Sequence, residues 1–283
     1  MVEPVSISEH PLPHLNAASE IANRLSVDSC YRLYQKLKNG TQICIIICYF
    51  DSPQNDTIAN MKIAPLDRAH IDPWAALLAT AFNRQIDLMH KLLDYLITDN
   101  RLLAWGAWDG SHLAAQYSCL RHHLHIPNQS SPVLVGMSIN MAVHPDFRGQ
   151  GLIKQVSQPV YKALKGQGGV AGVGFSNAEG VKVDRRSKGY GYRVLGQLQP
   201  TLAWIRSQAG ANSLKLTTEW PDKPFTEPIN PHRVCFQVTP SWIFHRYALH
   251  PFRHYPFGVW ETAVSVRGLV VFRPFRRGPI AGV

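Results

Sequence analysis

The sequence predicts an α/β fold in which strands and helices alternate within one main domain. Three observations favour this class. After Asp72-Pro73, apolar residues recur at helical spacing. Asp109-Gly110 separates two strand-like segments, as in a tight hairpin. An apolar strand at residues 133–143 then leads through a glycine-containing turn into an amphipathic segment.

The first part of this domain is expected to hold a strand, two helices and a hairpin. The strand is predicted at residues 61–64, and Asp72-Pro73 supplies an N-cap and a proline at the first helical position. The hairpin strands are predicted at residues 101–108 and 112–126. The apolar positions of the helices are Trp74, Leu77, Leu78, Ala81 and Phe82, then Ile86, Met89, Leu93 and Leu96.

The second part begins with the central strand at residues 133–143, the glycine turn and a helix at residues 152–165. Pro159 lies inside this helix, where it removes a backbone donor and favours a kink. The following elements are a strand at residues 170–175, a short helix from Ser176-Asn177 to Gly189, and strands at residues 192–199 and 202–206.

The composition is that of a globular protein with an anionic partner. The chain has 283 residues, 45% of them hydrophobic, with a formal charge of +10 and a pI near 9.5. Such a charge favours an anionic ligand. Nucleic acid is disfavoured because no nucleic-acid-binding signature appears. The seven arginines among residues 233–283 are interpreted instead as packing residues.

The cysteines and hydropathy predict a cytoplasmic protein without a membrane span. Five cysteines is an odd number, and no apolar leader opens the chain. The longest apolar run, residues 43–50, is far shorter than the ~20 residues that a membrane helix needs. The histidine clusters around His122 and His250 lack metal-ligand spacing, so we expect solvated histidines and no metal site.

Composition also suggests three regions. Residues 1–60 carry four basic and six acidic side chains and end in a linker at residues 51–56, so they are predicted to be an N-terminal extension with a strand at residues 42–50. Residues 61–207 form the main domain. Residues 208–283 form a partial C-terminal lobe, with one strand at residues 264–272 and a tail from residue 276.

The stretch Met141 to Ile153 is predicted to bind an anion. An apolar strand ends near Pro145, and two glycines, Gly149 and Gly151, precede a helix. Glycines let bare backbone N–H groups converge, and the helix adds the positive end of its dipole. Phosphate oxygens suit such a point.

The same stretch resembles the acetyl-CoA signature of the GNAT N-acetyltransferases, Arg/Gln-x-x-Gly-x-Gly/Ala. Arg148, Gly149 and Gly151 fit it, whereas Ile153 departs from the Gly or Ala of the pattern. Gly174-Phe175-Ser176-Asn177 followed by Lys188-Gly189-Tyr190 is similar to a second landmark of the family. The order of elements over residues 61–207 also resembles the GNAT fold, an α+β fold with a central mixed, mostly antiparallel sheet flanked by helices.

The resemblance implies an N-acetyltransferase that uses acetyl-CoA as co-substrate and an amine as acceptor, and it is compatible with a homodimer. In the family, the central strand holds the pantetheine arm and the turn holds the pyrophosphate. The cofactor-binding residues implied in this way are Met141, Ala142, Val143, Arg148, Gly149, Gln150, Gly151, Leu152, Ile153 and Asn177.

The resemblance leaves the catalytic acid and base open. Arg185 stands where many members carry a tyrosine, and Ser138 and Asn140 provide no carboxylate on the central strand. Tyr190, Tyr192, Asn140 or a water chain are the remaining candidates. A catalytically inactive GNAT-fold module that binds acyl-CoA or a partner protein is therefore the alternative.

Overall fold

The computed structural model describes nine parts of the chain, and in the strands at residues 43–48, 192–198, 275–277 and 280–282 it describes the backbone alone. These parts are residues 43–48, 61–127, 129–176, 192–198, 215–223, 232, 234–273, 275–277 and 280–282. The helix predicted to run from Ser176-Asn177 to Gly189 lies outside them beyond Ser176, and so does the strand predicted at residues 202–206.

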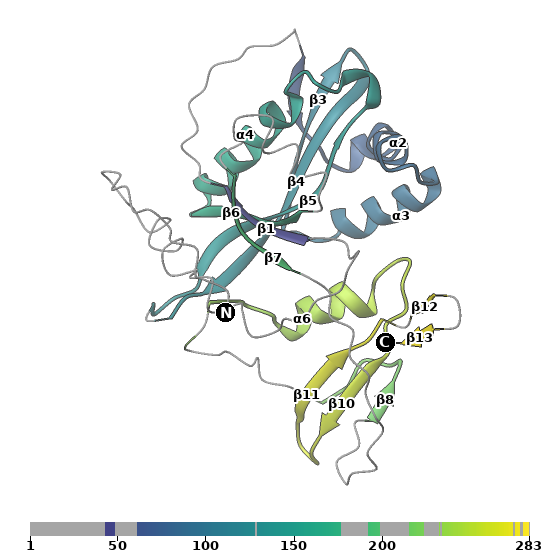
Figure 1. The fold of residues 1–283 in the computed structure, drawn as a ribbon, viewed down its shortest axis with the longest axis vertical. Coiled ribbons are helices and arrows are strands. Elements are labelled where there is room, and N and C mark those ends of the chain that lie inside the picture. The colour runs from purple at the N-terminus through teal and green to yellow at the C-terminus, as the bar shows by residue number, and fades with distance from the viewer. Residues whose placement is uncertain are drawn as a thin grey trace, which may run out of the picture.

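A large sheet forms the centre of the molecule (Figure 1). Its strands run in the order β2-β3-β4-β5-β6-β1-β7, and β9 pairs with β4 off this path. Their bounds are β1 Ile43–Cys48, β2 Lys62–Pro65, β3 Leu102–Asp109, β4 His112–His125, β5 Val133–Val143, β6 Ala171–Ser176, β7 Tyr192–Leu198 and β9 Cys235–Phe236.

The sheet is mixed and mostly antiparallel, which confirms the predicted fold class. Strands β5 and β6 pair in parallel, and every other described pair of this sheet is antiparallel. The hairpin of β3 and β4 turns at Gly110, whose φ of 58° is left-handed, as the Asp-Gly pair predicted.

Helices cover both faces of this sheet, with α4 (Leu152–Gly166) on one face and α2 (Ile71–Phe82) and α3 (Ile86–Ile97) on the other (Figure 1). A short 3₁₀ turn, η2 (Arg68–His70), precedes α2. Helix α2 ends at Asn83 in the left-handed conformation. Helix α4 continues through Pro159, as expected.

Each face has its own hydrophobic core. On the α4 face, Leu152, Val156, Val160 and Leu164 pack against Tyr117 and other residues of β3 and β4. On the other face, Trp74, Leu78 and Leu93 of the two helices pack against Leu113 and Ala142. The amphipathic patterns in the sequence therefore identified most of the inward positions, but the prediction was wrong for Phe82 and Ile86, which lie at the end of α2 and the start of α3 and are exposed.

Strand β1 comes from the predicted N-terminal extension but lies within the sheet. It pairs antiparallel with β6 on one side and with β7 on the other. The strand was predicted at residues 42–50, but its place was not, because pairing with strands more than 120 residues away leaves no local signal. A domain that starts at Met61 lacks this strand.

The C-terminal region contains more strands than expected. The strand predicted at residues 264–272 is β11, but residues 276–283 are not simply a tail, because they contribute to the β12–β13 hairpin. Its elements are β8 Lys215–Thr217, α6 Pro240–Ile243, the π-helical turn η4 Phe244–Ala248, β10 Phe257–Glu261, β11 Val266–Val271, β12 Phe275–Arg277 and β13 Ile280–Gly282.

A small separate core forms beneath the three-stranded sheet β11-β10-β8. Phe257, Val259 and Val266 are buried there, with Trp220 and Tyr247 packed against them. Strand β9 instead extends the large sheet along β4. The predicted C-terminal lobe thus has a core of its own and also contributes one strand to the main sheet.

Candidate functional site: the turn between β5 and α4

The end of β5 is fixed to its neighbour before the chain turns. The backbone N–H of His144 donates to the carbonyl of Ala114 at 2.8 Å. The chain then forms a single 3₁₀ turn, η3 (Pro145–Phe147), which the Nδ1 atom of His144 caps by accepting from the N–H of Asp146. This turn reverses the chain immediately beyond the sheet.

Gly149 and Gly151 then adopt a conformation that side-chain-bearing residues disfavour. Their φ angles are 82° and 70°, both left-handed. Gly151 is the N-cap of α4, and no side chain caps this helix end within the described residues. The N–H groups in the first turn of a helix have no intrahelical acceptor. The turn therefore presents backbone donors at the positive end of the helix dipole.

Leu152 and Ile153 point away from these donors. Both side chains are buried in the core between α4 and the sheet. Arg148 and Gly149 are exposed, and open space lies where a Cβ of Gly149 would stand. The departure of Ile153 from the expected Gly or Ala is therefore accommodated, because its side chain lies in the core.

Strands β5 and β6 separate next to the turn. Their parallel pairing covers Val135–Met137 and Ala171–Val173, whereas β5 continues to Val143 and β6 to Ser176. In the described part of the chain, the last six residues of β5 have no partner on the β6 side. Such a gap exposes backbone donors and acceptors to a ligand.

A β-bulge lies in the same stretch of β5. Gln116 pairs with Ala142 and Ser118 with Ile139, so that Asn140 and Met141 together oppose Tyr117. Asn140 has a φ of 46°, a left-handed conformation that asparagine tolerates. Bulges re-aim backbone groups and side chains beside functional sites.

Comparison with known proteins identifies this arrangement. Residues 62–193 match the family model described as "Acetyltransferase (GNAT) domain". This part of the chain is a GNAT domain. No curated protein matches the chain.

Solved structures that match the chain include acetyltransferases. One is AAC(6′)-Iy in complex with a bisubstrate analogue, at 17% identity and a TM-score of 0.41 over 53% of this chain and 100% of that one. Another is a GNAT-family acetyltransferase from Colwellia psychrerythraea, at 18% identity and a TM-score of 0.42 over 54% of this chain and 53% of that one. Such distant similarity says nothing about the substrate of this GNAT domain.

The structure brings together most of the predicted cofactor residues of the GNAT domain. Met141 and Val143 are half-buried at the end of β5, and Ala142 is buried against the α2 side. Arg148 through Ile153 follow directly in the turn and the first residues of α4. Asn177 lies outside the described residues, and its role remains a prediction.

The predicted catalytic candidates are not all near one another. Asn140 lies in the bulge of β5, but Tyr190 falls outside the described residues. Tyr192 begins β7, where it pairs with Cys48 of β1. Because β6 and β1 lie between β5 and β7, Tyr192 is three strand spacings from β5, about 14 Å across the sheet.

Sequence reasoning missed three buried polar residues on β4 beside the bulge. Gln116 is fully buried, and neither atom of its amide has a hydrogen-bond partner among the described residues. Ser118 is buried and donates to the carbonyl of Ile139 at 2.9 Å. On the other face, the hydroxyls of Tyr117 and Tyr161 are hydrogen-bonded. The only sequence signal was the run Gln-Tyr-Ser between the apolar residues 113–115 and 119–120 of this strand.

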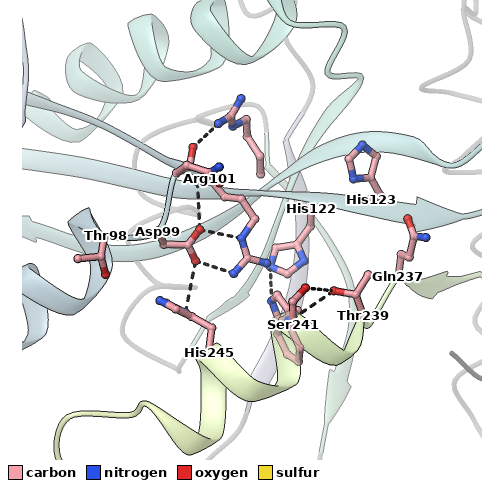
Figure 2. A pocket seen from close by; sticks show the side chains of 12 residues that line it. Thr98, Asp99, Arg101, His122, His123, Gln237, Thr239, Ser241 and His245 are labelled. Atoms are coloured by element: carbon pink, nitrogen blue, oxygen red, sulfur yellow. Dashed lines mark hydrogen bonds and ion pairs between the residues drawn. The ribbon is translucent and has the colours of Figure 1, made fainter. Parts of the chain in front are cut away.

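The prediction that the histidines are solvated is wrong for His122 and His245. His122 is only 4% exposed, and its Nε2 accepts a hydrogen bond from the indole Nε1 of Trp242. His245 stacks on Tyr95 with ring centroids 4.4 Å apart (Figure 2 shows both histidines). Both are shielded by contacts between the GNAT domain and the C-terminal region, which a local sequence pattern does not reveal.

The described part of the chain contains neither a candidate metal-binding group nor a helix that could span a membrane. No group of three or more His, Cys, Asp or Glu side chains there is arranged to hold a metal ion. Among the described helices, none combines the length and apolarity needed to cross a membrane.

Proposed function

We propose that the GNAT domain transfers an acetyl group from acetyl-CoA to the amine of an acceptor by direct attack. One observation carries the proposal: the last six residues of β5 have no β6 partner in the described part of the chain, and beyond the end of β5 follow two left-handed glycines and a helix N-terminus without a side-chain cap. The donors of the turn suit the pyrophosphate. The open edge of β5 suits the pantetheine arm, which can pair with backbone groups.

The chemistry requires little from side chains. The amine nitrogen attacks the thioester carbonyl, the C–N bond forms, and the C–S bond breaks to release the CoA thiolate. One proton leaves the amine nitrogen and one proton reaches the sulfur. Alignment of the neutral amine and hydrogen bonds to the oxyanion supply the acceleration, and backbone N–H groups on the open edge of β5 can provide the latter.

Several groups are candidates for carrying the two protons. Asn140 lies beside the open edge of β5, but an amide does not titrate in this role. Tyr190, Tyr192 or a chain of water molecules could carry the protons. Gln116 and Ser118, buried beside the bulge, can orient an amine or a water molecule without accepting its proton.

The alternative is a GNAT-fold module that binds acyl-CoA without turnover. The observation that favours it is the sequence of β5, which contains no carboxylate, histidine or tyrosine in its eleven residues. Binding would then require the same turn, but no acceptor would be consumed.

Release of free thiol from acetyl-CoA distinguishes the two functions. The purified full-length chain is incubated with acetyl-CoA and, in turn, with amines that represent polyamines, amino acids, aminoglycosides and peptide N-termini. Thiol release that depends on one of these amines supports the enzyme. Saturable binding of acetyl-CoA with no amine-dependent release on any member supports the binding module.

A further inference from the structure

A pocket of about 470 Å³ opens where β4 exchanges one neighbouring strand for another. Strand β3 pairs with β4 up to Leu120, and β9 pairs with it from Leu124 onward. The residues of β4 between these points line the pocket (Figure 2). This volume lies within the range of small-molecule sites.

The GNAT domain and the C-terminal region both form walls of this pocket, which we term the interface pocket. The GNAT domain contributes the connection between α3 and β3 and a short stretch of β4, and the C-terminal region contributes the residue that follows β9, helix α6 with its N-cap, and η4. The lining residues are Thr98, Asp99, Asn100, Arg101, Arg121, His122, His123, Gln237, Thr239, Ser241, Trp242 and His245.

The interface pocket is separate from the glycine turn between β5 and α4. Arg121 donates to the side chain of Gln167, which is the C-cap of α4, at 2.9 Å. Gly151 lies at the opposite end of this helix. Fifteen helical residues span about 22 Å, so a ligand in the pocket would not contact the turn.

The single carboxylate of the pocket is already neutralised by one arginine. Arg101 donates to Asp99 through Nε at 2.8 Å, through Nη2 at 2.5 Å and through its backbone N–H at 3.0 Å. Burial alone would raise the pKa of Asp99, but these hydrogen bonds lower it. Asp99 is therefore ionised, and the pair carries no net charge.

The charge of Arg121 is not neutralised in this way. Its Nη1 and Nη2 donate to neutral acceptors, the side chain of Gln167 and the carbonyl of Asn100. Its Nε is buried and lacks a hydrogen-bond partner within the described residues. No carboxylate of the described chain lies within ion-pair distance of Arg121. A buried donor without a partner is costly, and a ligand oxygen would remove that cost.

Two imidazoles of the interface pocket, those of His122 and His245, have a lowered pKa and are neutral at pH 7. Burial, followed by the nearby charge of Arg101, lowers the pKa of His122 to about 4. Burial also lowers the pKa of His245. Because Nε2 of His122 accepts from Trp242, its proton is on Nδ1, which is a further donor. Together Asp99, Arg101 and Arg121 carry one positive charge, and the pocket also offers several hydrogen-bond donors.

We propose that the interface pocket binds a small organic molecule with one carboxylate group. The monoanion balances the one positive charge, whereas a phosphate group with a charge near −2 would exceed it and would lie beside Asp99. The planar guanidinium of Arg121 matches a planar carboxylate. The rings of Trp242 and His122, in T-shaped contact at 5.5 Å, offer an apolar surface for the rest of the ligand.

A bound ligand would contact the GNAT domain and the C-terminal region at once. Arg121 and His122 belong to β4, whereas Thr239, Ser241 and Trp242 belong to α6 and its N-cap. Ligand binding to the folded form alone raises the apparent melting temperature. The proposal therefore predicts stabilisation that is independent of acetyl-CoA.

The test uses the full-length chain and two carboxylates, hippurate and indole-3-acetate. Their binding is followed by the indole N–H resonance of Trp242, which is assigned as the one missing from Trp242→Phe. The expected result is a saturable shift of this resonance with one or both carboxylates. Hippuramide, the neutral analogue of hippurate, should bind at least about tenfold more weakly.

Variants of Arg121 test the origin of the specificity. Arg121→Gln should weaken carboxylate binding by at least about tenfold, and Arg121→Lys, which retains the charge, should weaken it less. Arg84→Gln is the matched control, because Arg84 is exposed in the connection between α2 and α3 and should change nothing. Circular dichroism and acetyl-CoA titration establish that each variant is folded.

Three results would overturn the proposal. The first is the absence of a saturable shift with both carboxylates at millimolar concentration. The second is equal affinity for hippurate and hippuramide, which would show that the charge is not recognised. The third is tighter binding of inorganic phosphate than of either carboxylate, which would replace the monocarboxylate with a dianion.

Discussion

The indole Nε1 of Trp242 donates a hydrogen bond to Nε2 of His122 at a distance of 3.2 Å. The two residues are 120 positions apart, one in the short helix α6 and the other on β4 of the GNAT domain. The hydroxyl of Tyr95 likewise donates to the carbonyl of His245 at 2.9 Å. These bonds attach α6 to β4 and η4 to helix α3.

Trp242→Phe should destabilise the protein. Phenylalanine retains an aromatic ring but removes the donor, so the buried Nε2 of His122 loses its partner at a cost of about 1–3 kcal/mol. Urea unfolding would show this as a lower midpoint. Trp260→Phe is the control, since Trp260 is 53% exposed and should leave the midpoint unchanged. Equal midpoints for the two variants would contradict the structural role of this hydrogen bond.

His122 should make stability depend on pH. Its folded pKa is lowered, first by burial, from 6.5 to about 4. The unfolded chain therefore binds more protons between these values, and stability falls as pH decreases from 6.5 toward 4. The loss should reach up to about 3 kcal/mol. The unfolding free energy of wild type and His122→Gln, measured from pH 7 to pH 4, should differ in slope; parallel curves would exclude this histidine as the cause.

Removal of residues 1–60 should impair the domain. Composition suggested that residues 1–60 are an extension outside the main domain at residues 61–207. Strand β1 lies between β6 and β7, however, and its removal leaves both without a hydrogen-bonded neighbour on that side. We therefore expect a lower melting temperature for the truncated chain.

A chain that starts at Gly40 is the control for this truncation, because it retains β1. It should melt close to the full-length protein if β1 is the stabilising part of residues 1–60. If the chain starting at Met61 melted at the same temperature as both, β1 would be dispensable.

The elements of residues 61–176 could be predicted because their signals are local. The Asp109-Gly110 pair places one hairpin, and the spacing of apolar residues places the helices with their inward faces. The turn at Gly149 and Gly151 could be predicted for the same reason, since its function depends on consecutive backbone conformations.

The features that were missed depend on contacts between distant parts of the chain. The composition change near residue 51 suggested a domain boundary, yet β1 pairs with strands far along the sequence. His122 was expected to be solvated because Trp242, which shields it, is not close in sequence. Gln116 follows a short apolar run in β4, and only the fold shows that its amide is buried without a partner in the described residues.

Gln116→Met should stabilise the protein. The substitution keeps the length of the side chain and removes two buried polar atoms that lack partners among the described residues, a gain of about 1–2 kcal/mol. Ser118→Ala, one pleat away on the same face, should have the opposite effect, because the hydroxyl of Ser118 is hydrogen-bonded. Chemical unfolding of both variants measures the difference. A destabilised Gln116→Met would show that the amide has a bound partner.

The turn itself is best tested where a side chain would disturb the backbone donors most. Gly151 has a φ of 70° and caps α4, so Gly151→Asp strains the backbone and places a negative charge beside the expected pyrophosphate. Arg148→Ala should weaken acetyl-CoA binding less, because the exposed Arg148 acts in high dielectric. Gly166→Asp, at the other end of the same helix, introduces the same charge away from the turn.

Calorimetric titration of acetyl-CoA into wild type, Gly151→Asp and Gly166→Asp tests most directly whether the turn binds acetyl-CoA. We expect Gly151→Asp to lose at least tenfold in affinity, about 1.4 kcal/mol, while its circular dichroism spectrum and the affinity of Gly166→Asp remain those of wild type. Unchanged affinity in a folded Gly151→Asp protein would contradict phosphate binding at the turn, and with it the proposed acetyl transfer.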